Sequence, residues 1–96
     1  MITDQERKNM QQFYKAILSL ETEDECDAFF EDVATIKELI DMSARLEVAK
    51  MLDEGKVFSE ISQSTGASSA TISRVNKCIG YGSGGYKMVL DRIKDK

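Results

Sequence analysis

The stretch of residues 58–77 holds the side chains best suited to contact a nucleic acid. A helix-turn-helix joins two short helices through a tight turn that often contains glycine. It therefore needs an apolar anchor in the first helix, a small residue after it, a glycine in the turn and apolar residues inside the second helix. The residues at those positions are, in order, Ile61, Ser62, Gly66, Ile72 and Val75. This spacing predicts a helix-turn-helix whose second helix packs back onto Ile61.

The outer face of that second helix carries small, hydroxylated, amide-bearing or basic side chains and no acidic one. They are Ser69, Ala70, Thr71, Ser73, Arg74, Asn76 and Lys77. Hydroxyl groups exchange hydrogen bonds with base edges in the major groove, and an alanine or a threonine methyl contacts the thymine methyl. We therefore expect the first four of these residues to read bases. Arg74 and Lys77 lie farther along the helix, where contact with phosphates is more natural.

The charge of the chain is unevenly spread. The 96 residues have a net charge of −4, which taken alone argues against a nucleic-acid partner. Residues 1–55 carry six Lys/Arg and 14 Asp/Glu, whereas residues 56–96 carry seven Lys/Arg and three Asp/Glu. The predicted helix-turn-helix thus lies in the half with net positive charge, which suits a phosphate backbone. We therefore predict that the partner is double-stranded DNA.

Two other interpretations of the same stretch stay open. In the first, residues 58–77 form a helical hairpin whose polar face is merely solvated, as in many amphipathic helices. In the second, the protein is a dimeric protein-interaction module that uses the helix-turn-helix as a scaffold. The overall charge of −4 is the best support for this second interpretation.

The composition argues against an enzyme. There is no histidine, which excludes a histidine-containing catalytic triad, a histidine general base and a histidine-ligated metal site. The two cysteines, Cys26 and Cys78, form no CxxC motif, and we expect both to be buried and reduced. We predict no catalytic residue and no metal site.

The chain has no run of about 18 apolar residues and starts with polar and charged residues, so we expect no membrane span and no signal peptide. The expected location is the cytoplasm, with no membrane partner.

Hydrophobic spacing predicts an all-α fold of six or seven short helices. The expected helices are one over 4–19, one that begins at Thr22, one that begins after Thr35, one from Ser43 to Gly55, and three over 58–65, 68–79 and 86–94. Thr22 with Glu25, and Thr35 with Glu38, have the spacing of capping boxes. In the last helix we expect an apolar side made of Met88, Val89 and Ile93. We expect Tyr81 and Tyr86 to pack at the glycine-rich stretch 80–85, a hinge that sets this helix against the motif.

These helices are expected to form one domain over residues 1–96. Several of them have wide apolar faces for so small a chain, and a lone copy would struggle to cover them, so we expect a homodimer. The parts of the domain are dimerisation helices (1–55), the helix-turn-helix (58–79), a glycine-rich link (80–85) and a C-terminal helix (86–94).

Three runs of sequence resemble one known family. The run GASSATISRVNK at 66–77 closely resembles the recognition segment of the Trp repressor, and TIKELIDMSARLEVAKMLDEG at 35–55 resembles the helix that precedes its motif. The ending CIGYGSGGYKMVLDRI at 78–93 looks like Trp repressor-like proteins of the YerC/YecD type. The resemblance covers about residues 20–94, nearly the whole chain.

This resemblance implies an intertwined homodimer and a transcriptional regulator, most naturally a repressor, that reads an operator as two half-sites related by a two-fold axis. It also implies a pocket for a small-molecule corepressor, at positions that correspond to Thr35, Arg45 and Arg74. Arginines suit a ligand carboxylate because they donate hydrogen bonds in a planar fork.

The sequence departs from the repressor's pattern in that pocket. Val75 stands where the repressor has a glycine, and its side chain would intrude where an indole should lie; Cys78 stands where the repressor has a serine that helps to hold the ligand. Both changes argue against tryptophan. We expect no bound cofactor, and a small-molecule corepressor other than tryptophan stays open as the alternative. The connection from Gly55 to Ile61 is also one residue shorter than in the repressor, so the resemblance is firmer for the second helix of the motif than for the first.

Overall fold

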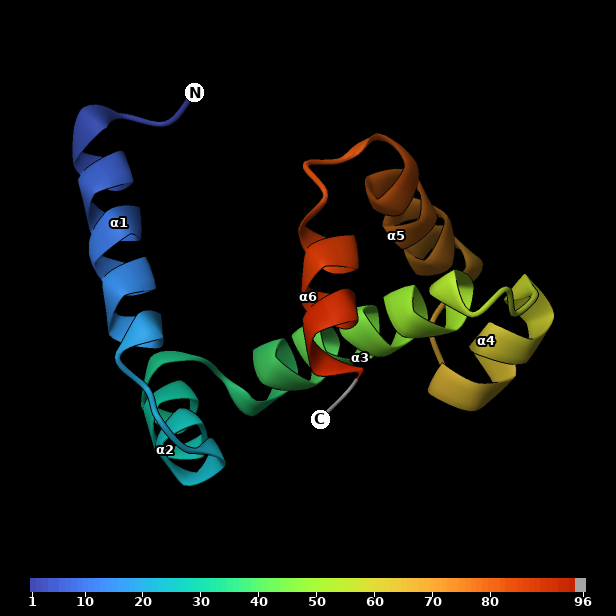
Figure 1. The fold of residues 1–96 in the computed structure, drawn as a ribbon, viewed down its shortest axis with the longest axis horizontal. Helices are drawn as coiled ribbons and strands as arrows, with labels where there is room; N and C mark the ends of the chain where they lie inside the picture. Colours follow the sequence, from blue (N-terminus) through green and yellow to red (C-terminus); the bar gives the residue numbers. More distant parts are fainter. Residues whose placement is uncertain (95–96) are drawn as a thin grey trace. The chain divides into compact units, whose positions relative to one another are not determined.

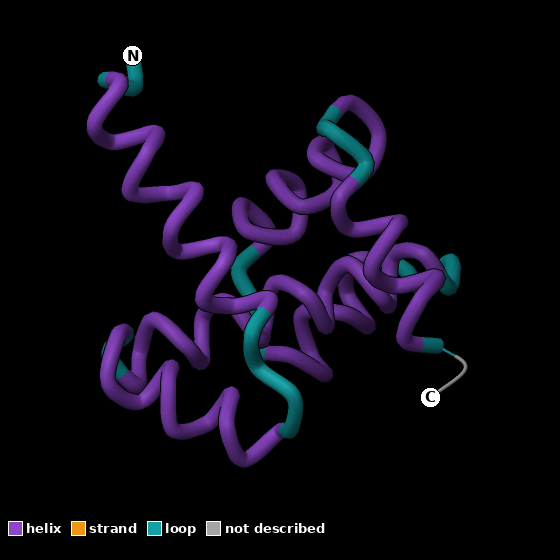
Figure 2. Tube along the Cα trace, turned by 60° about the vertical axis from the view of Figure 1, so that its left-hand side comes forward, coloured by secondary structure: helices purple, strands orange, loops and turns teal. Residues whose placement is uncertain are grey.

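The computed structural model describes residues 1–94, and this part of the chain folds into six α-helices without a strand (Figure 1 and Figure 2). The helices are α1 (Asp4–Leu18), α2 (Glu23–Val33), α3 (Ile36–Asp53), α4 (Phe58–Thr65), α5 (Ser69–Tyr81) and α6 (Gly85–Ile93). The predicted all-α fold is confirmed. Within residues 1–94 we find no helix with the length and apolarity needed to cross a membrane.

The first of two units, residues 1–36, contains α1 and α2. Thr3 caps α1 through a capping box, since its hydroxyl accepts a hydrogen bond from the Glu6 N–H and the Glu6 carboxylate accepts one from the Thr3 N–H. The rings of Phe13 on α1 and Phe29 on α2 lie 5.9 Å apart between centroids. Neither helix contains a buried residue. The apolar side chains of this unit therefore remain largely open to solvent in a single chain.

The start of α2 follows only half of the predicted capping box. The Thr22 hydroxyl accepts a hydrogen bond from the Glu25 N–H at 3.1 Å, as expected. The Glu25 carboxylate accepts its hydrogen bond from the N–H of Glu21, at 2.9 Å, rather than from that of Thr22. The Thr22 hydroxyl thus caps the helix, and the Glu25 carboxylate bonds the backbone N–H one residue earlier than a capping box requires.

The expected helix boundary at Ser43 is wrong, because α3 is one continuous helix of 18 residues. The Ser43 hydroxyl donates a hydrogen bond to the carbonyl oxygen of Leu39, 2.8 Å away and one turn earlier. A serine that bonds back in this way is compatible with a helix interior and caps nothing.

Gly55 ends α3 as predicted. Its φ is +83°, in the left-handed region that favours glycine. The N–H of Gly55 bonds the carbonyl of Leu52, and the N–H of Lys56 bonds that of Met51. This pair of hydrogen bonds is the Schellman motif, which satisfies carbonyls left over at the helix end.

The second unit, described over residues 37–94, contains a hydrophobic core to which four helices contribute. Its buried residues are Val48, Ala49 and Met51 from α3, Ile61 from α4, Ile72 and Val75 from α5, and Leu90 from α6. Each of these helices buries only one to three side chains. The core thereby fixes α4 and α5 to the long helix α3.

The inner face of α6 differs from the predicted one. Met88, Val89 and Ile93 are exposed, whereas Leu90 is only 6 % exposed and belongs to the core. Tyr86 packs against the core, whereas Tyr81 is 92 % exposed, so the expected packing of Tyr81 at the glycine-rich stretch is wrong. Apolar residues occupy both sides of α6, and Tyr86 and Leu90, one turn apart, define the side that faces inward.

The glycine-rich link is shorter than expected. Gly80 and Tyr81 form the last residues of α5, and Gly85 is the first residue of α6, so the link between the two helices covers residues 82–84. The two helices pack against each other across it.

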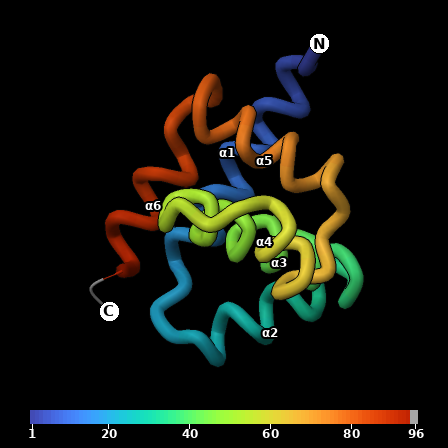
Figure 3. The backbone as a smooth tube through the Cα atoms, turned by 90° about the vertical axis from the view of Figure 1, so that its right-hand side faces the viewer, coloured from blue at the N-terminus to red at the C-terminus, as the bar shows by residue number. Residues whose placement is uncertain are grey.

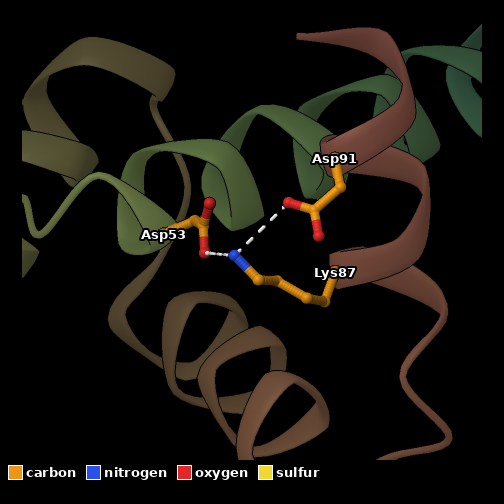
Figure 4. A network of polar contacts seen from close by, with 3 residues as sticks. All are labelled: Asp53, Lys87 and Asp91. Carbon is orange, nitrogen blue, oxygen red and sulfur yellow. Dashed lines mark hydrogen bonds and ion pairs between the residues drawn. The ribbon is translucent and has the colours of Figure 1, made fainter.

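A charged cluster ties α6 to the end of α3 (Figure 4). The Lys87 Nζ lies 3.2 Å from an oxygen of Asp53 and 3.4 Å from one of Asp91. Hydrogen bonds to these two carboxylates raise the pKa of Lys87 above its usual value. All three side chains are partly exposed, so the cluster orients α6 more than it stabilises the fold.

Both cysteines are free and exposed, so the expectation that they are buried is wrong. Cys26 lies on α2, a helix with no buried residue. Cys78 lies one turn after Val75 on α5, outside the core that holds Val75.

Candidate nucleic-acid interface

The helix-turn-helix predicted from the sequence is present as α4, a three-residue turn and α5. Figure 3 shows α4 in yellow leading through this turn into the orange α5, and the two helices pack against each other. Gly66 has a φ of +75° and donates its N–H to the carbonyl of Ser62 at 2.8 Å, which closes α4. Ser68 then caps α5, because its hydroxyl accepts a hydrogen bond from the Thr71 N–H. The bounds of α4 agree with the predicted ones, and α5 extends two residues farther.

The apolar residues of the motif pack as the spacing predicted. Ile61 and Ile72 are fully buried, and Val75 is 2 % exposed. All three belong to one core cluster, together with Val48 of α3. Burying this side of α5 leaves the opposite side facing outward.

The outward side of α5 presents the polar face expected to contact DNA. The exposed residues among the predicted contacts are Ser69, Ala70, Ser73, Arg74 and Lys77, and Asn76 is exposed with them. The helix contains no acidic residue, so its only formal charges are the two basic side chains. Its N-terminal end, where backbone N–H groups are left over, also favours an anion such as a phosphate.

Thr71 differs from the other predicted base contacts because it also takes part in the cap of α5. Its N–H donates to the Ser68 hydroxyl oxygen at 3.1 Å, and the Ser68 hydroxyl donates to the Thr71 hydroxyl oxygen at 3.1 Å. Thr71 is half-buried. Its hydroxyl oxygen already accepts one hydrogen bond, which leaves the Thr71 O–H as its donor towards a base.

The predicted ligand-pocket residues are spread over both units. Thr35 belongs to residues 1–36, whereas Arg45 and Arg74 are exposed on α3 and α5 of the other unit. Val75 is engaged in the core. Cys78 lines a mainly apolar hollow of about 500 Å³ together with Leu46, Tyr86 and other residues of α6 and the link. In the part of the chain that the structure describes, no group of three or more His, Cys, Asp or Glu is placed to hold a metal ion.

Sequence reasoning missed two hydroxyl groups inside the motif. Ser62 was singled out only for its small size, and Thr65 was not singled out at all. In the structure, both hydroxyls form hydrogen bonds across the turn. The available signal was a hydroxylated residue four positions and another one position before the turn glycine, since such side chains commonly bond nearby backbone groups.

Sequence comparison relates this chain to known proteins. The family model for the Trp repressor protein matches residues 8–94. The uncharacterised protein YerC of Bacillus subtilis (strain 168) is 49% identical over 88 residues, which cover 92% of this chain and 85% of YerC.

Two solved structures resemble the chain along most of its length. A TrpR-like protein from Eubacterium eligens ATCC 27750 superposes with a TM-score of 0.87 at 50% identity, over 90% of this chain and 89% of that one. A candidate Trp repressor from Staphylococcus aureus superposes with a TM-score of 0.88 at 42% identity, over 93% of this chain and 89% of that one. The chain therefore belongs to the Trp repressor family, among its YerC-like members.

Proposed function

We propose that this protein is a sequence-specific DNA-binding regulator of transcription that acts as a repressor by occupying an operator. The observation that carries the proposal is the outward face of α5, which presents small, polar or basic side chains and no carboxylate. Membership of a family of transcription regulators supports it. In this proposal Ser69, Ala70, Thr71 and Ser73 contact bases in the major groove, and Arg74 and Lys77 contact phosphates.

A homodimer is part of the proposal. The first unit has no buried residue in either helix, although it contains Phe13, Leu18 and other large apolar side chains. A second copy of the chain would cover such faces, and a two-fold dimer would present two α5 helices to two half-sites. Light scattering at micromolar concentration is expected to give twice the mass of the chain. A monomer would count against the two-fold operator.

DNA binding in this proposal does not require tryptophan. Val75 has its side chain in the core. By the resemblance to the repressor, Cys78 stands where a serine would help to hold the ligand. We expect the same dissociation constant for DNA with and without millimolar L-tryptophan. A gain in affinity of tenfold or more would instead support a pocket that includes Thr35, Arg45 and Arg74. The proposal keeps the expected cytoplasmic location.

Lys77→Ala tests the contact with phosphates. Each phosphate contact releases counterions, so its loss is expected to flatten the slope of log K against log salt by about 1 and to weaken binding to every sequence similarly. The matched control is Lys37→Ala, which removes the same charge from α3, where Lys37 pairs with Asp41 at 3.2 Å. Equal effects of the two substitutions would contradict a specific role for Lys77.

Ser73→Ala tests base reading. Ser73 is exposed in the middle of α5. Loss of its hydroxyl is expected to cost roughly 1 kcal/mol at one base pair of each half-site and to leave preferences elsewhere unchanged. Binding profiles across all single-base operator variants measure this loss.

The alternative function, a protein-interaction module, has its own test. Absence of salt-dependent DNA binding by the intact protein, together with stable capture of a protein partner, would favour that alternative.

A further inference from the structure

The turn of the helix-turn-helix is fastened by two side chains of α4. The Thr65 hydroxyl donates a hydrogen bond to the carbonyl of Ile61 at 2.7 Å and accepts one from the N–H of Ala67 at 3.1 Å. The Ser62 hydroxyl donates a hydrogen bond to the carbonyl of Ala67 at 3.0 Å. All three hydrogen bonds are partly buried, which shields them from competition with water.

These hydrogen bonds fix both peptide groups that flank Ala67. The N–H of Ala67 belongs to the peptide that joins it to Gly66, and its carbonyl belongs to the peptide that joins it to Ser68. One hydroxyl therefore holds the peptide that enters Ala67, and the other holds the peptide that leaves it. Ala67 also packs against the core, so side-chain packing and hydrogen bonding restrain the same residue.

The residue that follows Ala67 is the one that starts α5. Ser68 caps α5 through its hydroxyl, which accepts the Thr71 N–H. The path from α4 to α5 thus contains only three residues, and the middle one is fastened to α4 at both of its backbone polar groups. We therefore expect loss of either hydroxyl to change the direction in which α5 leaves the turn.

We propose that Ser62 and Thr65 are positioning residues that set the sequence specificity of α5 by fixing its orientation on α4. The inference rests on the proposed DNA-binding function. Direct reading of bases needs hydrogen-bond geometry good to a few tenths of an ångström, because contacts lose strength steeply with distance and angle. A long, flexible side chain such as that of Lys77 tolerates a tilt of its helix and still reaches a phosphate.

Thr65→Val and Ser62→Ala separate this role from simple stability. Valine keeps the shape of threonine and removes the hydroxyl, and alanine has a higher helix propensity than serine. Thr65→Ser restores the hydroxyl and is the rescue variant. Ser64→Ala is the control, because Ser64 is exposed on the same helix and its hydroxyl is not among those that hold the turn.

The measurement is the dissociation constant for a selected operator and for random DNA of equal length, each at several salt concentrations. Thr65→Val and Ser62→Ala are each expected to lower the ratio of specific to non-specific affinity by roughly five- to tenfold. Non-specific affinity should stay within about twofold and the salt slope should not change. Thr65→Ser and Ser64→Ala should keep the wild-type ratio.

The possible results distinguish the two claims. If the hydroxyls served only stability, a smaller folded fraction would lower specific and non-specific binding equally and leave their ratio unchanged, which overturns the inference. If the wild-type protein has no specific complex with any DNA, the proposed function fails and the inference fails with it.

Amide hydrogen exchange tests the inferred geometry without DNA. The Ala67 N–H should lose protection in Thr65→Val but not in Thr65→Ser. Retained protection in Thr65→Val would contradict the inferred geometry.

Discussion

Truncation of the Ile61 side chain tests whether one core holds α5 in place. Ile61 is fully buried and belongs to the cluster that contains Val48 of α3 and Ile72 and Val75 of α5. Ile61→Ala removes three carbon atoms from this position. Loss of their burial costs roughly 2–2.5 kcal/mol at about 0.8 kcal/mol per methylene, and the cavity left behind brings the expected loss of unfolding free energy to about 3–4 kcal/mol.

The assay is urea unfolding followed by circular dichroism at one fixed protein concentration, because the stability of a dimer depends on concentration. Ile61→Val, which removes one carbon, should lose about 1 kcal/mol, so the series is graded. The control is Val57→Ala. Val57 is 62 % exposed at the start of α4 and makes no capping hydrogen bond through its side chain. Its loss should change stability by less than about 0.5 kcal/mol.

The core described above would be refuted by a loss below about 1 kcal/mol for Ile61→Ala, or by equal losses for Ile61→Ala and Val57→Ala. Either result would mean that Ile61 is not enclosed by α3 and α5. The orientation of α5 would then lack the support on which its proposed contact with DNA depends.

Three further predictions concern the turn, the first helix and the charged cluster. Gly66→Ala should lose about 1 kcal/mol in urea unfolding because its φ of +75° suits glycine, whereas Gly80→Ala inside α5 should gain about 0.5–1 kcal/mol. The hydrogen bonds from Thr3 lower the pKa of Glu6, so their contribution to α1 is present above pH 4.5 and should fade as the pH falls through the lowered value. An NMR titration of the Glu6 carboxyl that shows an ordinary pKa would contradict this. Lys87→Met should slightly lower the unfolding midpoint at low salt, and a deficit that persists at 1 M salt would show that charge is not the cause.

The features predicted most accurately from the sequence were those of the helix-turn-helix, which depend on the spacing of its apolar and turn residues. Ile61, Ile72 and Val75 share one core, because Ile72 and Val75 lie three residues apart on one face of their helix and that face packs back onto Ile61. Gly66 and Ser68 marked the turn and the cap through their special backbone and hydrogen-bonding properties. The predicted helix-turn-helix was therefore confirmed almost to the residue.

Features that depend on tertiary packing could not be predicted in the same way. Serine is compatible with both a cap and a helix interior, so Ser43 did not reveal that α3 continues through it. Apolar residues lie on both sides of α6, and only the position of the core selects Leu90 over Val89. The hydrogen bonds of Thr65 arise from the path of the turn, which no spacing rule specifies.

The central claim is that two copies of this chain read a two-fold DNA site with α5. Selection of bound sequences from a random pool of double-stranded DNA, carried out at a stated salt concentration, tests it most directly. The account predicts a palindromic site whose half-sites lie about one helical turn apart, and loss of preference at one position per half-site with Ser73→Ala. Recovery of no enriched sequence, or of a single site without two-fold symmetry, would contradict it.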